Sequence, residues 1–254
     1  MDLGLGGKNA LVMGASKGIG RGIAEALARE GAAVAMVSRS AERIADAAAE
    51  VGADTGSTVV GLAADTGDTD RLPELVEDAV AAIGGIDILV TNTGGPPPGT
   101  ALEHGTGDWE EAYRHLLIAP RILVEAVLPG MRERGWGRIV NVGSTSVSEP
   151  IPGLAMSNIH RAALSGFFKT LATEVAADGI TVNDIETGRF ATDRLAANWG
   201  SWERMEKEAV TAVPAGRLGD PAEYGNLVAF LASNKAGFIT GTSIPIDGGM
   251  KRSR

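Results

Sequence analysis

A glycine-rich segment near the start of the chain has the spacing of a turn that binds a pyrophosphate. Gly14-Ala-Ser-Lys-Gly18-Ile-Gly20 follows an apolar run and opens an Ala-rich one. Glycines let the backbone turn tightly and approach a phosphate, and a helix N-terminus offers free N–H groups and the positive end of its dipole. A plain strand–helix turn is the alternative interpretation. The residues predicted to bind a dinucleotide here are Gly14, Ser16, Lys17, Gly18, Ile19 and Gly20.

The second apolar run ends in Val37-Ser38-Arg39-Ser40, which carries no carboxylate. A site that prefers NAD usually places Asp or Glu here, where it accepts a hydrogen bond from the ribose 2′-hydroxyl. Arg39 can instead meet a 2′-phosphate, and Lys17 adds a second positive charge. The pattern therefore predicts NADP(H) as the cofactor, and solvated surface charges are the alternative for both cations.

The composition excludes several other functions. The 254 residues carry a net charge of −9, which would repel a nucleic-acid backbone. The chain has 0 cysteines, and its histidines, His104, His115 and His160, lack the spacing of a metal site. No apolar run reaches the ~18 residues of a membrane span. We expect a cytoplasmic protein that binds no nucleic acid, membrane or metal, and we interpret the basic end Lys251–Arg254 as solvated.

Apolar runs typical of strands alternate with helical runs along the whole chain, which predicts one doubly wound α/β domain of the Rossmann type over residues 1–254. Several strand candidates are apolar throughout, as expected for a parallel sheet covered on both faces. The expected strands are Ala10–Met13, Ala33–Val37, Val59–Leu62, Ile86–Thr91, Arg138–Val142, Ile180–Ile185 and Thr242–Pro245. The expected helices are Ile19–Glu30, Ala41–Val51, Asp70–Ala82, Asp108–Arg134, Ser157–Ala177 and Pro221–Ala232.

Two connections are long for a compact domain, and both follow strand ends, where ligands bind in such sheets. One is Gly94–Gly107, and the other is Arg189–Leu218, which we interpret as a substrate lid. The second carries Phe190, Trp199 and Trp202. These aromatic residues predict an apolar or aromatic wall for a small-molecule substrate, and packing of the lid is the alternative.

With these features the sequence resembles the short-chain dehydrogenase/reductases over its whole length, in particular their 3-oxoacyl-ACP-reductase-like members. The segment Arg138-Ile-Val-Asn-Val-Gly-Ser144 is similar to the strand that ends in their catalytic serine. The resemblance also implies a seven-stranded parallel sheet, hydride transfer with NAD(P)(H) at a carbonyl or alcohol, and a homodimer or homotetramer. The further cofactor contacts that it implies are Asp65 for the adenine, Asn92 and Gly94 after the fourth strand, and Thr192.

Three of the four catalytic positions depart from that family's pattern of Asn, Ser and Tyr-x-x-x-Lys. Counting thirteen residues from Ser144 places Ser157 at the tyrosine and Arg161 at the lysine, and counting back from Pro129 places Leu116 at the asparagine. An ammonium group lowers the pKa of a neighbouring tyrosine toward neutrality, whereas a serine hydroxyl is a much weaker acid. We therefore expect a non-standard proton donor.

Other residues near these positions could take part in the chemistry. His160 lies three residues after Ser157 on the same expected helix and can carry a proton, with packing as the alternative role. Arg161 is predicted to hold the nicotinamide ribose or a substrate carboxylate, or to be a helix-surface residue. Pro120 has no N–H and would free the carbonyl of Leu116, which predicts a kink and a water-linked proton path there, or a kink with a packing role only.

Two functions remain open from the sequence. The first is an NADPH-dependent oxidoreductase in which Ser144, Ser157, Arg161 and His160 are the candidate catalytic residues. The second is a cofactor-binding homologue without ordinary ketoreductase activity: a dehydratase, isomerase or cyclase, or a structural subunit. The complete glycine motif and the retained Ser144 favour the first.

Overall fold

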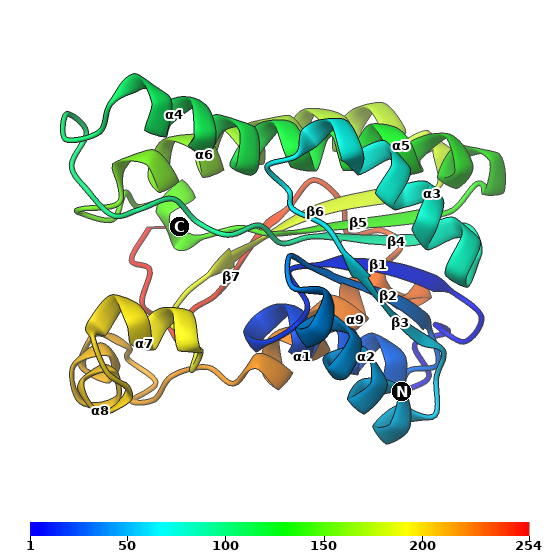
Figure 1. Ribbon diagram of the computed structural model, residues 1–254, viewed down its shortest axis with the longest axis horizontal. Coiled ribbons are helices and arrows are strands. Elements are labelled where there is room, and N and C mark those ends of the chain that lie inside the picture. The colour runs from blue at the N-terminus through cyan, green and yellow to red at the C-terminus, as the bar shows by residue number, and fades with distance from the viewer. Residues whose placement is uncertain (254) are drawn as a thin grey trace.

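The computed structural model describes residues 1–253, apart from the side chain of Asn198. A seven-stranded, all-parallel sheet in the order β3-β2-β1-β4-β5-β6-β7 forms its centre, with helices on both faces (Figure 1). This order reverses between β1 and β4, which confirms the predicted doubly wound Rossmann fold. The strands are β1 (Asn9–Met13), β2 (Ala33–Ser38), β3 (Val59–Ala63), β4 (Ile88–Thr91), β5 (Gly137–Val142), β6 (Ile180–Thr187) and β7 (Ser243–Ile246).

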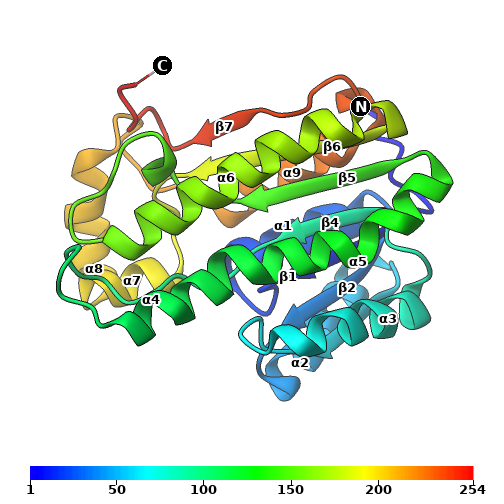
Figure 2. The ribbon, with the colours of Figure 1, turned by 90° about the horizontal axis from the view of Figure 1, so that it is seen from above.

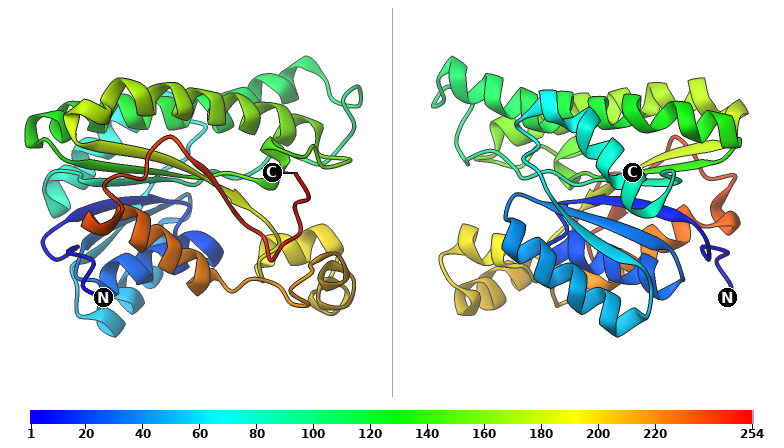
Figure 3. Two further views of the ribbon diagram at one scale, coloured as in Figure 1. Left: turned by 180° about the vertical axis from the view of Figure 1, so that it is seen from behind. Right: turned by 45° about the vertical axis from the view of Figure 1, so that its right-hand side comes forward.

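The helices lie in two layers because the strands bury apolar side chains on both faces. Figures 2 and 3 show α3, α5 and α6 across one face and α1, α2 and α9 across the other. Alternate strand residues divide accordingly: Val12 packs in the α1/α9 layer and Leu11 in the α3/α5/α6 layer. The α-helices are α1 (Gly18–Arg29), α2 (Ala41–Thr55), α3 (Leu72–Ile83), α4 (Thr106–Tyr113), α5 (Ala119–Arg134), α6 (Ala155–Val175), α7 (Asp193–Trp199), α8 (Trp202–Arg204) and α9 (Pro221–Ala232). None of the helices described is long and apolar enough to cross a membrane.

Two glycines allow α1 and α9 to cross closely beneath the sheet. A Cβ on Gly22 would lie 2.5 Å from the carbonyl oxygen of Pro221. A Cβ on Gly225 would collide with the carbonyl oxygen of Gly22. Because the obstacle is backbone in both cases, no side-chain rotation relieves it. The crossing therefore fixes α1, whose N-terminus carries the glycine turn.

We expect Gly225→Ala to lower the free energy of unfolding by about 1–3 kcal/mol through overpacking, which exceeds the roughly 1 kcal/mol that alanine gains over glycine in a helix. Gly166→Ala in α6 is the matched control, because nothing lies within 4 Å of its added Cβ. That variant should be stabilised by up to about 1 kcal/mol. Urea denaturation measures both. Equal stabilisation of the two variants would contradict the close crossing.

The single helix predicted over Asp108–Arg134 is wrong, because a π-helical segment, η2 (Arg114–Ile118), separates α4 from α5. The N–H of Ala119 donates to the carbonyl of Arg114, five residues earlier. Pro120 lies in the first turn of α5 and cannot donate a backbone hydrogen bond. A widened turn around the buried Leu116 thus lies where the kink was predicted, and the water-linked proton path stays a prediction.

The segment Arg189–Leu218 is helical and lies to one side of the sheet, over the strand ends (Figure 1). It contains α7, α8 and a π-helical turn, η5 (Met205–Ala209). Ala196, Met205 and Ala209 form a small apolar cluster of their own. The segment thus has its own small core, separate from the two main layers.

Candidate active site

A cleft of about 520 Å³ opens at the carboxyl ends of β1, β2 and β4, between the glycine turn, the loop after β4 and the start of α7. This is the edge at which parallel α/β sheets bind ligands. All but one of the predicted cofactor-binding residues line this cleft; the exception is Arg161. The lining residues among them are Gly14, Ser16, Lys17, Gly18, Ile19, Gly20, Arg39, Asp65, Asn92, Gly94 and Thr192.

The glycine turn has the geometry that a pyrophosphate requires. Gly14 and Gly18 adopt φ angles of 62° and 58°, which side chains other than glycine rarely adopt. A Cβ on Gly20 would collide with the carbonyl oxygen of Gly14. No side chain caps the N-terminus of α1, so its first N–H groups remain available to an anion. The turn therefore fits a dinucleotide.

Arg39 and Arg43 line the same end of the cleft, next to Ser38. Among the described residues Arg39 has no carboxylate within 4 Å, while Ser40 caps α2 by accepting the N–H of Arg43 at 3.4 Å. Lys17, the second predicted cation, is instead paired with Asp193 of α7 at 2.7 Å. Arg43 was not among the predicted cofactor-binding residues, although it lies in the first turn of α2, four residues after Arg39. This end therefore has two guanidinium groups and suits a 2′-phosphate.

Arg161 joins Ser157 of α6 to the end of β5, two residues before Ser144, and none of these three residues lines the cleft described above. The Arg161 guanidinium donates from Nε to Ser157 Oγ at 3.3 Å and from Nη1 to the carbonyl of Val142 at 3.1 Å. Ser144 Oγ accepts the N–H of Ser146 at 3.1 Å, so its own proton is free to be donated. Arg161 is thus turned toward the sheet and does not line the cleft, an arrangement that does not support its predicted contact with the nicotinamide ribose.

A buried polar network lies beneath Arg161 and was not predicted. Thr91 Oγ1 donates to Asn141 Oδ1 at 2.8 Å, and Asn141 Nδ2 donates to Asp184 Oδ1 at 2.7 Å. The Asp184 side chain is 2% exposed, and its Oδ2 is buried without a hydrogen-bond partner among the described residues. Burial raises the pKa of Asp184, while hydrogen bonds from Asn141 and Ser165 and the charge of Arg161 oppose that rise. Asp184 therefore lies close enough to Arg161 for the charge of each to affect the pKa of the other.

Burial, together with the nearby charge of Arg194, lowers the pKa of Arg161 to about 10. A pKa of about 10 still leaves the guanidinium charged at neutral pH. Arg161 therefore keeps its positive charge, but it is a poor proton donor at pH 7.

His160 packs against α4, an environment that favours the alternative packing role over the predicted catalytic one. Its Nδ1 lies 2.7 Å from the carbonyl oxygen of Met156, and its ring packs 5.5 Å from Trp109 and 6.4 Å from Tyr113, measured between centroids. The ring is buried between α6 and α4 and does not line the cleft. The alternative packing role is the one the structure supports.

The predicted aromatic wall finds no support in the main cleft. Phe190 is buried and stacks edge-to-face on Tyr224 at 5.3 Å, and Trp199 packs in the lid's own cluster. Trp202 is 45% exposed, and none of the three lines the main cleft. Packing of the lid on itself and on the core, the alternative interpretation, accounts for Phe190 and Trp199.

Of the chain end predicted to be solvated, Lys251 is largely buried, Arg252 and Ser253 are exposed, and Arg254 lies outside the described residues. Lys251 donates to Glu186 Oε2 at 3.0 Å and to Ser148 Oγ at 3.3 Å, and both partners of the ion pair are at least nine-tenths buried. Glu149 accepts the N–H groups of Arg252 and Ser253. The acids Asp184 and Glu186, which alternate with apolar residues in a buried strand, were the available sequence signal for this burial.

Lys251→Ala is expected to lower the free energy of unfolding by about 2 kcal/mol, because it leaves the Glu186 carboxylate buried without its cation. The double variant Lys251→Met with Glu186→Gln should recover most of this loss, since no unpaired charge remains. Guanidinium denaturation of the two variants measures the difference. A loss that persists in the double variant would contradict the pair's electrostatic role.

Comparisons with known proteins agree with this fold and site. The family model described as enoyl-(acyl carrier protein) reductase matches residues 14–251. The 3-oxoacyl-(acyl-carrier-protein) reductase of Vibrio cholerae is 38% identical over 97% of this chain and 98% of its own. Human dehydrogenase/reductase SDR family member 4 is 35% identical over 96% of this chain and 88% of its own.

A solved structure extends the similarity to three dimensions. The L-sorbose reductase of Gluconobacter frateurii, solved with NADPH and L-sorbose, superposes with a TM-score of 0.96 and 33% identity over 100% of both chains. The sheet order, the glycine turn and these matches together lead to one conclusion: the chain belongs to the short-chain dehydrogenase/reductase family.

Proposed function

We propose that this protein is an NADP(H)-dependent oxidoreductase that interconverts a carbonyl group and an alcohol with a non-standard proton donor. The observation that carries the proposal is the cleft in which the glycine turn at one side and Arg39 with Arg43 at the other match a phosphorylated dinucleotide. The relatives support it, since the sorbose reductase was solved with NADPH. The substrate is a small molecule.

The residues present fit the cofactor. The glycine turn would hold the pyrophosphate, Arg39 and Arg43 the 2′-phosphate, and Asp65 the adenine end of the cleft. Asn92, Gly94 and Thr192 line the other end, toward the nicotinamide. When bound, NADPH supplies the hydride.

The protein's own task is to polarise the substrate oxygen and to protonate it. Ser144 Oγ has a free proton and donates to that oxygen. Arg161 orients Ser157 through Nε and supplies a positive charge at the end of β5, behind the residues that line the cleft. A solvent water that reaches Ser157 delivers the proton. This arrangement lacks a proton donor whose pKa lies near neutral pH. We therefore expect the rate of carbonyl reduction to be about 10²–10⁴-fold lower than in a site with a tyrosine.

The second candidate is a homologue that binds the cofactor without redox turnover. The substitutions at Leu116, Ser157 and Arg161 favour it, because they remove three of the family's four catalytic side chains. A dehydratase, isomerase or cyclase, or a structural subunit, would retain the cleft.

One experiment separates the two candidates. NADPH binding is titrated by its fluorescence, and NADPH oxidation is then followed at 340 nm, the usual absorbance wavelength of the reduced cofactor, with a panel of carbonyl compounds. Oxidation with any member of the panel supports the oxidoreductase. Binding without oxidation of NADPH by any member supports the second candidate.

The remaining predictions concern assembly and location. The lid Arg189–Leu218 closing over the substrate, one domain over residues 1–254, a cytoplasmic location, and a homodimer or homotetramer remain proposals. Exposed apolar side chains at Tyr113 and Ile159, on the outer faces of α4 and α6, support self-association. Light scattering after size-exclusion chromatography measures the mass directly.

A further inference from the structure

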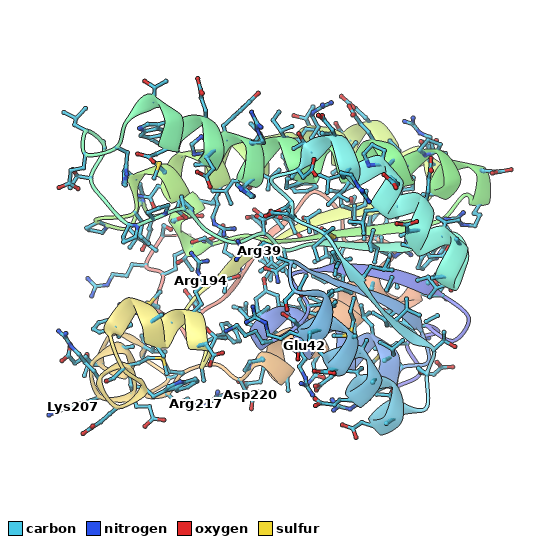
Figure 4. The ribbon with its side chains drawn as sticks, viewed as in Figure 1. Arg39, Glu42, Arg194, Lys207, Arg217 and Asp220 are labelled. Carbon is cyan, nitrogen blue, oxygen red and sulfur yellow. The ribbon has the colours of Figure 1, made fainter. Side chains whose placement is uncertain are left out.

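Arg194 places a guanidinium group in the cleft beside the site of the proposed chemistry. It lies in the first turn of α7 and lines the cleft together with Gly94 and Gly95. A Cβ on Gly95 would collide with the Arg194 guanidinium, which shows how closely this group approaches the loop after β4. Figure 4 shows Arg194 on the side of α7 that faces the rest of the molecule, and Lys207 on the outer side of the lid.

The charge of Arg194 is not balanced by the protein. No carboxylate of the described residues lies within 4 Å of it, and the neighbouring Asp193 is already paired with Lys17 at 2.7 Å. Arg161 is close enough for the charge of Arg194 to lower its pKa. The buried Asp184 lies near Arg161 on the sheet side. It does not line the cleft and so does not balance the charge of Arg194.

The like charges of Arg194 and Arg161 repel, and an anion bound at Arg194 would relieve this repulsion. An arginine fork binds a carboxylate or phosphate through two parallel hydrogen bonds. We therefore propose that Arg194 binds an anionic group of the substrate, a carboxylate or a phosphate, next to the carbonyl that is reduced. This inference rests on the proposed oxidoreductase function.

The cofactor offers a competing source of the same chemistry. Thr192, two residues before Arg194, approaches the glycine turn, since a Cβ on Gly18 would lie 3.3 Å from Thr192 Cγ2. Arg194 is therefore also near the place expected for the pyrophosphate. The experiment must distinguish an anion of the substrate from the anion of the cofactor.

Binding is measured first, because it does not depend on turnover. Calorimetric titration of 4-oxopentanoate and of its methyl ester into the protein saturated with NADP⁺ compares an anionic with a neutral ligand of the same shape. We expect the acid to bind about 10- to 100-fold more tightly than the ester. Arg194→Gln should remove this preference without changing the affinity for the ester or for NADPH.

Lys207→Gln is the matched control, because it removes one positive charge from the exposed face of the same lid. It should leave the preference for the acid intact, which excludes a general effect of net charge. Equal binding of acid and ester by the unmodified protein overturns the proposal. Weaker NADPH binding by Arg194→Gln, with the acid preference retained, also overturns it and assigns Arg194 to the pyrophosphate.

Turnover separates this inference from the function on which it rests. If NADPH is oxidised with neutral carbonyl compounds but oxo acids have no advantage in binding or kcat/KM, the proposed anion-binding role of Arg194 is wrong. The proposed oxidoreductase function is then still supported. When oxo acids bind through Arg194 but no carbonyl compound is reduced, the oxidoreductase is wrong and the anion site stands.

Discussion

Replacing Arg39 with aspartate is expected to weaken NADPH binding by about 100-fold and to make NADH the better-bound cofactor. The change removes one of two guanidinium groups at the 2′-phosphate end of the cleft, where a charged hydrogen bond contributes about 1.5–3 kcal/mol. It also introduces a carboxylate that repels the phosphate but can accept a hydrogen bond from a ribose 2′-hydroxyl. Titration of cofactor fluorescence measures both affinities.

Two further variants sharpen this test. Arg43→Gln should weaken NADPH binding without improving NADH, because it removes a cation and adds no acceptor for the ribose hydroxyl. Lys17→Gln should have a smaller effect, since the Lys17 charge is already satisfied by Asp193, with both side chains more than half exposed. Equal affinities of the unmodified protein for NADPH and NADH would show that Arg39 does not select the cofactor.

The sheet was predictable because its determinants are local. Each strand is a short apolar run next to a helical one, and the predicted and observed strands agree to within one or two residues at each end. The helix Pro221–Ala232 was predicted with its observed bounds, since Asp220 caps its N-terminus and proline occupies its first position. The glycine turn was equally predictable, because residues other than glycine rarely adopt its positive φ angles.

The site was less predictable because its contacts join distant segments. The pairing of Lys17 with Asp193 spans the glycine turn and the lid, and no sequence pattern specifies it. Arg161 turns toward the sheet because Asp184 and the Val142 carbonyl lie there, which its place on a helix does not reveal. His160 precedes Arg161 by one residue, so its side chain leaves α6 in a different direction from that of Arg161. This difference in direction separates a position near Ser157 from one that packs against α4.

Restoring the family's pair of side chains, Ser157→Tyr with Arg161→Lys, is expected to raise the rate of ketone reduction by about 10²–10⁴. Positions 157 and 161 are one helical turn apart on α6, and the Arg161 side chain already bonds to Ser157, so the introduced groups are neighbours. An ammonium beside the new phenol lowers its pKa and lets it protonate the substrate oxygen near neutral pH.

The matched control is Ser157→Phe with Arg161→Lys, which adds the same ring without the hydroxyl. Reduction of one ketone by NADPH is compared among the three proteins, with NADPH affinity and melting temperature measured for each. A gain in the tyrosine variant that the phenylalanine variant lacks identifies proton delivery as the missing step. No gain, with cofactor binding and fold preserved, would mean that the cleft differs in more than these two positions.

The pH profile gives this prediction a second readout. A tyrosine that acts as general acid must be protonated, so the rate of reduction should be constant at low pH and fall as the pH rises through the tyrosine's pKa. That pKa should lie below the usual value of about 10 because of the adjacent ammonium. Asp184 acts in the opposite direction when its carboxyl group is ionised, because the carboxylate would attract the introduced ammonium away from the phenol. Adding Asp184→Asn to the double variant should therefore move the falling limb to lower pH, whereas a limb that does not move would show that the carboxylate and the ammonium do not interact.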